Sequence, residues 1–311
     1  MFGNASGGRP PRCKRGDVVE VRGAGEILAT LDAQGTLDGL PFMPEMAKHC
    51  GQTFRVQRRA DKLLLDRYYY IAHMKDTVFL EDLRCDGGAH GGCQLGCLMF
   101  WKTAWLKPTD AVGPFEKRPH EESALRTTQD GRFFCQATEL VNATVRLPWW
   151  DLRQYVRDLA YREVGFRQLV RVLGLAVYNK LRRLCGRDPC GVLRGSQKQT
   201  PATTLDLQSG DLVEVKSAAE IVATLDAEGK NRGLGFAPEM LPHCGRRYRV
   251  ARPVENIVVE ASGEMAHLSN TVILAGVTCQ GISARCCPRL CYHLWREAWL
   301  KRVPDARCAG V

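Results

Sequence analysis

Three signatures of familiar enzyme chemistry are missing from the sequence: a glycine-rich nucleotide loop, a dinucleotide-binding fingerprint and a Ser-His-Asp order. Nucleotide-dependent chemistry therefore has no support. A signal peptide is missing too, because residues 1–16 are rich in Gly, Pro and Arg and contain no apolar run. We expect these residues to form a frayed arm and the protein to be cytoplasmic.

Cysteine, by contrast, is abundant, with 14 cysteines in 311 residues. In an oxidising compartment this number would predict disulfides, whereas in a reducing one it favours metal or cluster ligation. Because no signal peptide is found, we expect ligation. The length predicts two domains, and a hydrophobic content of 45% suffices for a core in each.

An internal repeat sets the architecture. The stretch GDVVEV at residues 16–21 recurs as GDLVEV at 210–215, and the shift of 194 positions then holds without a gap to Lys107 and Lys301. About forty of the ninety-two aligned positions are identical, which chance does not produce. The chain is therefore a duplicated module with an unrelated segment between its copies.

The hydrophobic period within one copy is mostly two, which predicts short strands. In the first copy we expect strands at residues 17–21, 53–58, 62–67, 77–83 and 101–107, and short helical pieces at 26–31 and 44–49. Five short strands in a module of this size are typical of a small SH3-like barrel. The predicted fold class is α+β, mainly β, with tandem duplicated SH3-like small β-barrels joined by a helical middle segment.

The expected domains follow from the repeat. They are a flexible arm (1–15), a first SH3-like module (16–108), a linker and helical segment (109–205), a second SH3-like module (206–303) and a tail (304–311).

Five stretches, GDVVEV, LDGLPFMPEM, HCG, RCDGGAHGGCQLGC and FWKTAWLK, carry a resemblance. Together they resemble an uncharacterised family of bacterial proteins built from two such halves. The resemblance covers both halves and the middle segment. It implies the duplicated architecture but no established activity, so function must be argued from the sites.

The densest group of potential ligands lies in residues 84–97. It offers Cys85, His90, Cys93 and Cys97, and thiolate and imidazole are donors that zinc and iron-sulfur clusters accept. Five glycines in the same stretch let the backbone turn tightly enough to point several side chains at one centre. The spacing differs from the two-knuckle CxxC zinc pattern, so it leaves the metal open between zinc and an iron-sulfur cluster.

The second copy offers a comparison of ligand sets. Four cysteines occur in both copies, which is the number that a tetrahedral zinc or a four-thiolate cluster needs. The aligned pairs are Cys50 and Cys244, Cys85 and Cys279, Cys93 and Cys287, and Cys97 and Cys291. His90 aligns with Ala284, and Cys286 aligns with Gly92. Either Cys50 and Cys244 complete the two metal sites, or His90 completes the first and Cys286 the second.

In a third arrangement, three cysteines hold the metal and one coordination position stays open, as in catalytic sites. His90 would then be an acid, a base or a labile ligand, because its charge changes near neutral pH. The adjacent His49 and Cys50 are a weaker candidate for a nucleophilic pair, since neighbouring side chains point in different directions. The repeated tryptophans at 101, 105, 295 and 299 are expected in the core.

A basic amphipathic helix is predicted at residues 166–184, after a helical stretch that Trp149 and Trp150 open. Its cations exclude a membrane span. The helix fits an anionic membrane surface, which would make the protein membrane-peripheral, or an acidic partner, or it covers the barrels. Nucleic acid ranks lower as a partner, because the modules show no cluster of basic and aromatic residues.

Two hypotheses for function result. The first is a metal-binding protein with zinc or iron-sulfur sites in both modules and a role in binding or assembly with an unknown protein partner. The second is a metalloenzyme with an open-coordinated iron-sulfur or non-haem metal centre in the first module, acting on a small-molecule substrate in a bacterial biosynthetic pathway. His90, which the second copy lacks, is the residue that separates them.

Overall fold

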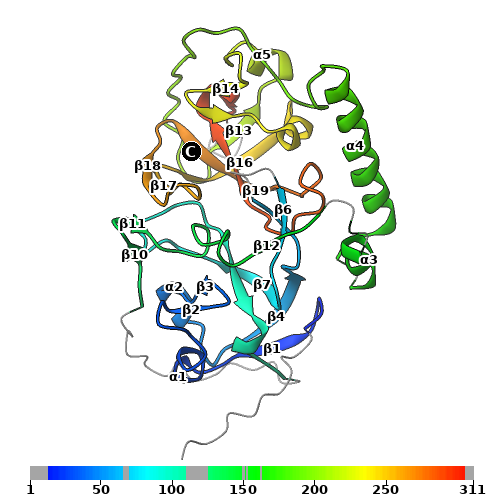
Figure 1. The fold of residues 1–311 in the computed structure, drawn as a ribbon. Coiled ribbons are helices and arrows are strands. Elements are labelled where there is room, and N and C mark those ends of the chain that lie inside the picture. The colour runs from blue at the N-terminus through cyan, green and yellow to red at the C-terminus, as the bar shows by residue number, and fades with distance from the viewer. Residues whose placement is uncertain are drawn as a thin grey trace, which may run out of the picture. The chain divides into compact units, whose positions relative to one another are not determined.

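The computed structural model describes residues 13–65, 70–109, 125–148, 151, 153–161 and 163–304. It is mainly β, and it divides into two compact units. The first unit takes its described residues from 1–90, 97–165 and 260–264, and the second from 91–96, 166–259 and 265–311. Each unit is built around a five-stranded sheet from one copy of the repeat (Figure 1).

The sheet of the first unit has the order β8-β7-β4-β1-β9, and every neighbouring pair is antiparallel. Its strands are β1 (Val18–Val21), β4 (Thr53–Arg59), β7 (Thr77–Arg84), β8 (Leu98–Lys102) and β9 (Leu106–Pro108). Between β8 and β9 the chain makes the 3₁₀ turn η2 (Thr103–Trp105). The stretch 101–107, predicted as one strand, is thus two strands that belong to opposite edges of a curled sheet.

The sheet of the second unit repeats this arrangement in the order β20-β19-β16-β13-β21. Its strands are β13 (Leu212–Val215), β16 (Arg247–Pro253), β19 (Thr271–Thr278), β20 (Tyr292–Arg296) and β21 (Leu300–Arg302), with η4 (Glu297–Trp299) before the last. The pairing of the strands is the same in both sheets. Val18 lies opposite Arg55 in the first sheet, and the equivalent residue Leu212 lies opposite Arg249 in the second. The duplication is therefore confirmed in three dimensions, down to the register.

The four repeated tryptophans lie in the cores, each with no exposed surface. Trp105 packs edge-on against Phe42 with ring centroids 5.4 Å apart, and Trp299 packs against Phe236 at 5.2 Å. Each of these two indoles donates a hydrogen bond to a threonine hydroxyl at 3.1 Å. The prediction that these residues are core is confirmed, and the matching contacts show that both copies pack in the same way.

Short elements connect the sheet strands. In the first unit they are α1 (Ala24–Leu28), β2 (Thr36–Leu37), β3 (Leu40–Pro41), α2 (Pro44–Ala47), β5 (Leu63–Leu65) and β6 (Tyr70–His73). Their counterparts in the second are α5 (Ala218–Val222), β14 (Lys230–Asn231), β15 (Leu234–Gly235), η3 (Pro238–His243), β17 (Asn256–Val258) and β18 (Met265–His267). Of the short strands in the first copy, β2, β3 and β6 were not predicted, whereas β5 lies within the predicted strand 62–67.

The middle segment contributes to both units. Strands β10 (Thr128–Gln129), β11 (Arg132–Phe133) and β12 (Val145–Arg146) and helix α3 (Arg153–Ala160) belong to the first unit, whereas α4 (Phe166–Leu184) belongs to the second. The observed bounds of α4 are those predicted from its apolar spacing. Trp149 and Trp150, expected to open the preceding helix, lie outside the described residues.

Candidate functional site

The loop between β7 and β8 carries the predicted ligands of the first copy. Its two ends are joined where the backbone N–H of Cys85 donates to the carbonyl of Cys97 at 2.8 Å. Gly87 adopts a φ of 71°, a left-handed conformation that suits glycine, and the N–H of His90 donates back to the Gly87 carbonyl at 2.9 Å. This turn folds His90 back over Cys85, so that both side chains face the same interior space.

A carboxylate from a distant helix meets this loop. Glu45 lies in the first turn of α2 and is only 5% exposed. Its Oε1 accepts hydrogen bonds from the backbone N–H of Ala89 at 3.1 Å and from Nδ1 of His90 at 2.7 Å. A buried carboxylate is costly without partners, so these two bonds explain how Glu45 is tolerated here.

The second nitrogen of His90 is also engaged. Its Nε2 donates to the carbonyl of Phe134 at 3.1 Å, and the whole residue is 1% exposed. Both partners of the ring, a carbonyl and a carboxylate, only accept hydrogen bonds. The imidazole satisfies them both in its charged form, which makes Glu45 and His90 a buried ion pair.

The pKa shifts agree with this assignment. Burial alone would lower the pKa of His90, but its hydrogen bond to Glu45 and the charge of that carboxylate raise the pKa above its usual range. Burial would likewise raise the pKa of Glu45, yet the bond to His90 and the donors of the loop lower it. Each charge is therefore stabilised by the other rather than by water.

This pair predicts a pH-dependent stability for the metal-free protein. Because the pKa of His90 is raised, its stabilising effect is complete below about pH 6.5 and is lost as pH rises through the folded value. Because the pKa of Glu45 is lowered, its effect is complete above about pH 4.3 and is lost as pH falls through the folded value. Denaturant unfolding with a chelator present should therefore show the largest gap between wild type and Glu45→Gln within this window. A gap of constant size across the pH range would contradict the ion pair.

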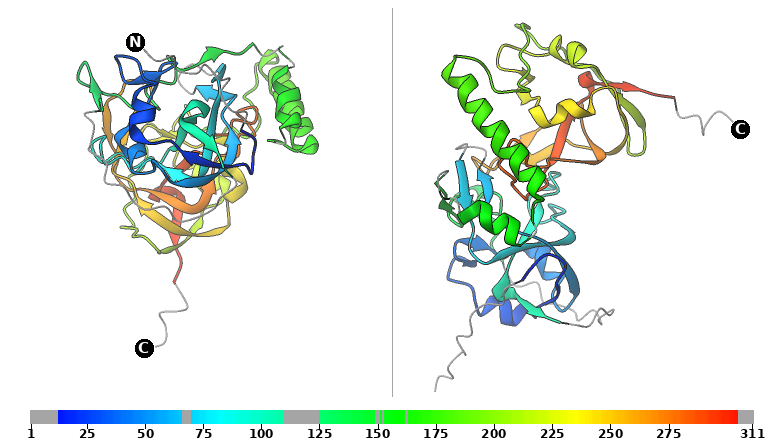
Figure 2. Two further views of the ribbon diagram at one scale, coloured as in Figure 1. Left: turned by 90° about the horizontal axis from the view of Figure 1, so that it is seen from below. Right: turned by 90° about the vertical axis from the view of Figure 1, so that its right-hand side faces the viewer.

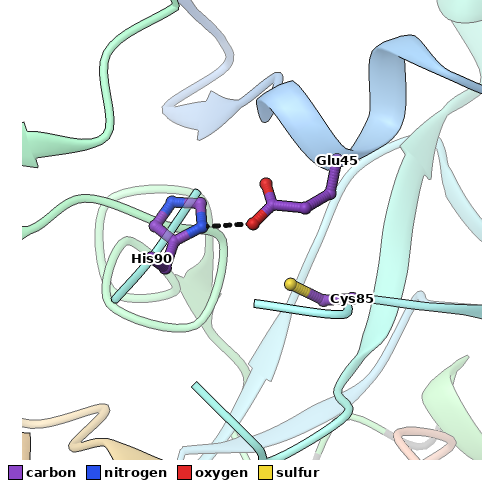
Figure 3. Close-up of side chains that lie close together, drawn as sticks. All are labelled: Glu45, Cys85 and His90. Atoms are coloured by element: carbon purple, nitrogen blue, oxygen red, sulfur yellow. Dashed lines mark hydrogen bonds and ion pairs between the residues drawn. The ribbon is translucent and has the colours of Figure 1, made fainter. Parts of the chain in front are cut away.

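The other carboxylate oxygen of Glu45, Oε2, is buried and has no hydrogen-bond partner in the part of the chain that the structure describes. The sulfur of Cys85 lies near this carboxylate, and one ligand atom from each of Glu45, Cys85 and His90 lies within 4.8 Å of the others (Figure 3). Cys85 is the partly exposed member of the three. A carboxylate, a thiol and an imidazole thus converge on one buried spot that contains an unsatisfied acceptor.

The middle segment holds the far side of this site in place. Gln136, 3% exposed, accepts from the N–H of Phe100 at 2.8 Å and donates to the carbonyls of Phe100 at 2.8 Å and Pro41 at 3.1 Å. It therefore pairs with the β8 backbone much as a strand would, two residues after the Phe134 carbonyl that binds His90. Sequence reasoning missed both Gln136 and Glu45. The signal for Glu45 was a charged residue repeated, as Glu239, inside an otherwise apolar helical turn.

The remaining predicted ligands of the first copy are not brought to this spot. Cys50 is buried, and burial raises the pKa of its thiol to about 11. Cys93 belongs to the second unit, where its sulfur accepts from the N–H of Val258 at 3.3 Å. Cys97 lies at the end of the loop, where its carbonyl accepts the hydrogen bond from the N–H of Cys85. Within the described residues, the one group of three or more donors within 4.8 Å is that of Glu45, Cys85 and His90.

The second copy keeps the carboxylate and the thiol but loses the imidazole. Glu239 Oε1 accepts from the N–H and hydroxyl of Ser283 at 2.8 and 2.7 Å, and its Oε2 accepts from the N–H of Gln280 at 2.8 Å. Burial, followed by the charge of Glu239, raises the pKa of Cys279. Buried Ala284 occupies the position of His90. Both oxygens of this carboxylate are therefore satisfied by the protein itself.

Four further cysteines of the second copy were predicted as ligands. The carbonyl of Cys291 accepts a hydrogen bond from the N–H of Cys279 at 2.8 Å, as the carbonyl of Cys97 does from Cys85 in the first copy. Cys286 and Cys287 are buried in the turn that follows Ala284, and Cys244 is partly buried at the end of η3. As ligands these four residues, with Cys279, stay predictions. All thirteen cysteines in the described part of the chain lie outside disulfides.

No family model, curated protein or solved structure matches this chain.

Proposed function

We propose that the protein binds one zinc ion through Glu45, Cys85 and His90. The observation that carries this proposal is the convergence of a carboxylate, a thiol and an imidazole, which offer three ligand atoms within 4.8 Å of one another. Glu45 also has capacity for a further contact, because its Oε2 is buried and has no hydrogen-bond partner among the described residues, which is rare in native proteins. The proposal includes an SH3-like barrel as the scaffold of each copy.

The charge of the site supports a cation. In the metal-free protein, the proton on Nδ1 of His90 supplies the positive charge between the ring and Glu45. A metal-bound histidine usually keeps its other N–H on a carbonyl or carboxylate, which orients the ring. The bond from Nε2 of His90 to Phe134 is such a contact. Zinc would replace the proton on Nδ1 and leave this second bond unchanged.

The donor set favours zinc among the candidate metals. Zinc accepts thiolate, imidazole and carboxylate ligands together. An iron-sulfur cluster is held mainly by several thiolates, and this group supplies one sulfur. A zinc-bound thiolate is also stable in a reducing compartment, so the proposal includes a cytoplasmic location.

The stoichiometry separates this proposal from a metal site in each copy. Purified chain freed of metal and reduced should take up one zinc per chain by equilibrium dialysis and elemental analysis. Glu45→Gln should lose this zinc, whereas the matched change Glu239→Gln in the second copy should keep it. Two zinc ions per chain, or equal loss in both variants, would overturn the proposal. Visible absorption in anaerobically purified protein would instead favour an iron-sulfur cluster.

A second candidate function is a metalloenzyme, and one observation favours it. Three protein donors leave one position of a tetrahedral zinc for water or substrate, which is the arrangement of catalytic rather than structural zinc. The partly exposed Cys85 marks the side from which a small molecule would reach the ion. In the cobalt(II)-substituted protein, added azide should change the visible spectrum if the position is open. An unchanged spectrum at saturating azide would leave a structural or binding role.

A further inference from the structure

An apolar row runs along α4, a helix that supplies none of the proposed zinc ligands. Its exposed residues are spaced by three, four or seven positions, so they lie on one side of the helix. Five of them expose more than half of their surface: Phe166 (70%), Val170 (53%), Val177 (60%), Leu181 (56%) and Leu184 (76%). The row is about 27 Å long, and α4 is one continuous helix (Figure 2). A row of large exposed apolar side chains on one helix face marks an interaction surface.

The helix buries a different side. Leu169 is 5% exposed and Val172 is 1% exposed. At about 100° per residue, these two side chains point roughly 85° and 145° away from the centre of the apolar row. The packing that holds α4 in place therefore leaves the row available to an external partner.

Charge decides what kind of partner fits. Helix α4 contains no Asp or Glu, and it contains five cations, namely Arg167, Arg171, Lys180, Arg182 and Arg183. Pairing the row with the same row of a second chain would bring ten cations together without a compensating acid, which is unfavourable. An apolar row flanked by cations instead matches the boundary between acyl chains and anionic headgroups.

We propose that α4 lies on an anionic phospholipid surface. The apolar row enters the boundary between acyl chains and headgroups, and the flanking cations contact the lipid phosphates. Within the described ranges, no helix is long and apolar enough to cross a membrane. This role is independent of zinc, because α4 supplies no residue to the Glu45, Cys85 and His90 group.

Vesicle flotation with the full-length chain tests the proposal. The chain should bind vesicles of mixed phosphatidylglycerol and phosphatidylcholine, bind phosphatidylcholine alone at least about tenfold more weakly, and dissociate as salt rises. The double variant Val177→Asp with Leu181→Asp should lower binding at least about tenfold. Both positions are exposed, so the fold should persist, which circular dichroism checks. Val145→Asp, at a position 73% exposed on β12, is the matched control and should bind as wild type does.

Three results would overturn the lipid assignment. The first is no binding to the mixed vesicles at low salt. The second is unchanged binding by the double variant. The third is a chain that binds poly-glutamate, loses this binding when Val177 and Leu181 are replaced, and does not bind the vesicles. This result would make an acidic protein the partner.

Discussion

Replacing His90 with alanine is expected to weaken zinc binding at least about 100-fold, because even residues that only orient a ligand cost 10–100-fold in metal affinity. His90 would contribute the ligand atom itself, Nδ1, and its fixed orientation through Phe134. The loss should appear in competition against a chromophoric chelator at constant pH. Cys85→Ser, which removes the thiolate with little change in shape, should weaken zinc binding by a similar factor.

The same variant tests whether His90 is a ligand or an acid-base group beside the metal. If His90 is a ligand, the His90→Ala variant should lose its zinc. The matched change His73→Ala should have no effect on zinc binding. His73 does not belong to the three-ligand group, and its Nδ1 lies 2.6 Å from the carbonyl oxygen of Asp61. If His90 acts instead as an acid or base beside a metal held by other residues, zinc content stays intact. Affinities within threefold of wild type for both His90→Ala and Cys85→Ser would rule out the three-residue site. Circular dichroism should establish that both variants are folded.

Replacing Trp105 with alanine is expected to cost about 3–5 kcal/mol of unfolding free energy. The indole has no exposed surface, it packs edge-on against Phe42, and its N–H reaches the hydroxyl of Thr30 at 3.1 Å. Removing it leaves a cavity in the core of the first unit, and the Thr30 hydroxyl keeps only its bond to the Ile27 carbonyl at 2.6 Å. Urea unfolding followed by circular dichroism measures the loss without relying on tryptophan fluorescence.

The repeat supplies the comparison for this variant. Trp299→Ala removes the same contacts in the second unit, so its cost should agree with that of Trp105→Ala to within about 1 kcal/mol. Val145→Ala, at a site 73% exposed, should change stability by less than about 0.5 kcal/mol. A cost below 1 kcal/mol for either tryptophan would mean that these side chains do not hold the sheets together.

Patterns that are local in the sequence predicted structure well. The period-two stretches at β1, β4 and β7 became strands within one or two residues of the predicted bounds, and α4 begins and ends where its apolar spacing does. The stretch 101–107 failed as a single strand, because η2 directs its two halves to opposite edges of the curled sheet. Periodicity reports which side of a strand is buried, whereas it does not report where the chain turns between edges.

The residues of the candidate site also divide into those that the sequence predicted and those that it did not. Cys85 and His90 were singled out by residue type, and the structure does bring them together. Cys93, three positions after His90, falls in the other unit, because direction in a glycine-rich loop depends on each backbone turn rather than on spacing. Glu45 was not predicted, since it lies forty positions away and reaches the loop only when α2 packs against it.

The amino-acid sequence by itself determined the duplication, the tryptophan cores and the amphipathic α4, because identity, burial and helical spacing are written along the chain. Only the tertiary structure decided that a carboxylate completes the group around His90 and that the second copy satisfies its own carboxylate with Ser283 and Gln280. The physical reason is that a buried charge is tolerated only where partners from separate segments converge on it, and that convergence exists only in the fold.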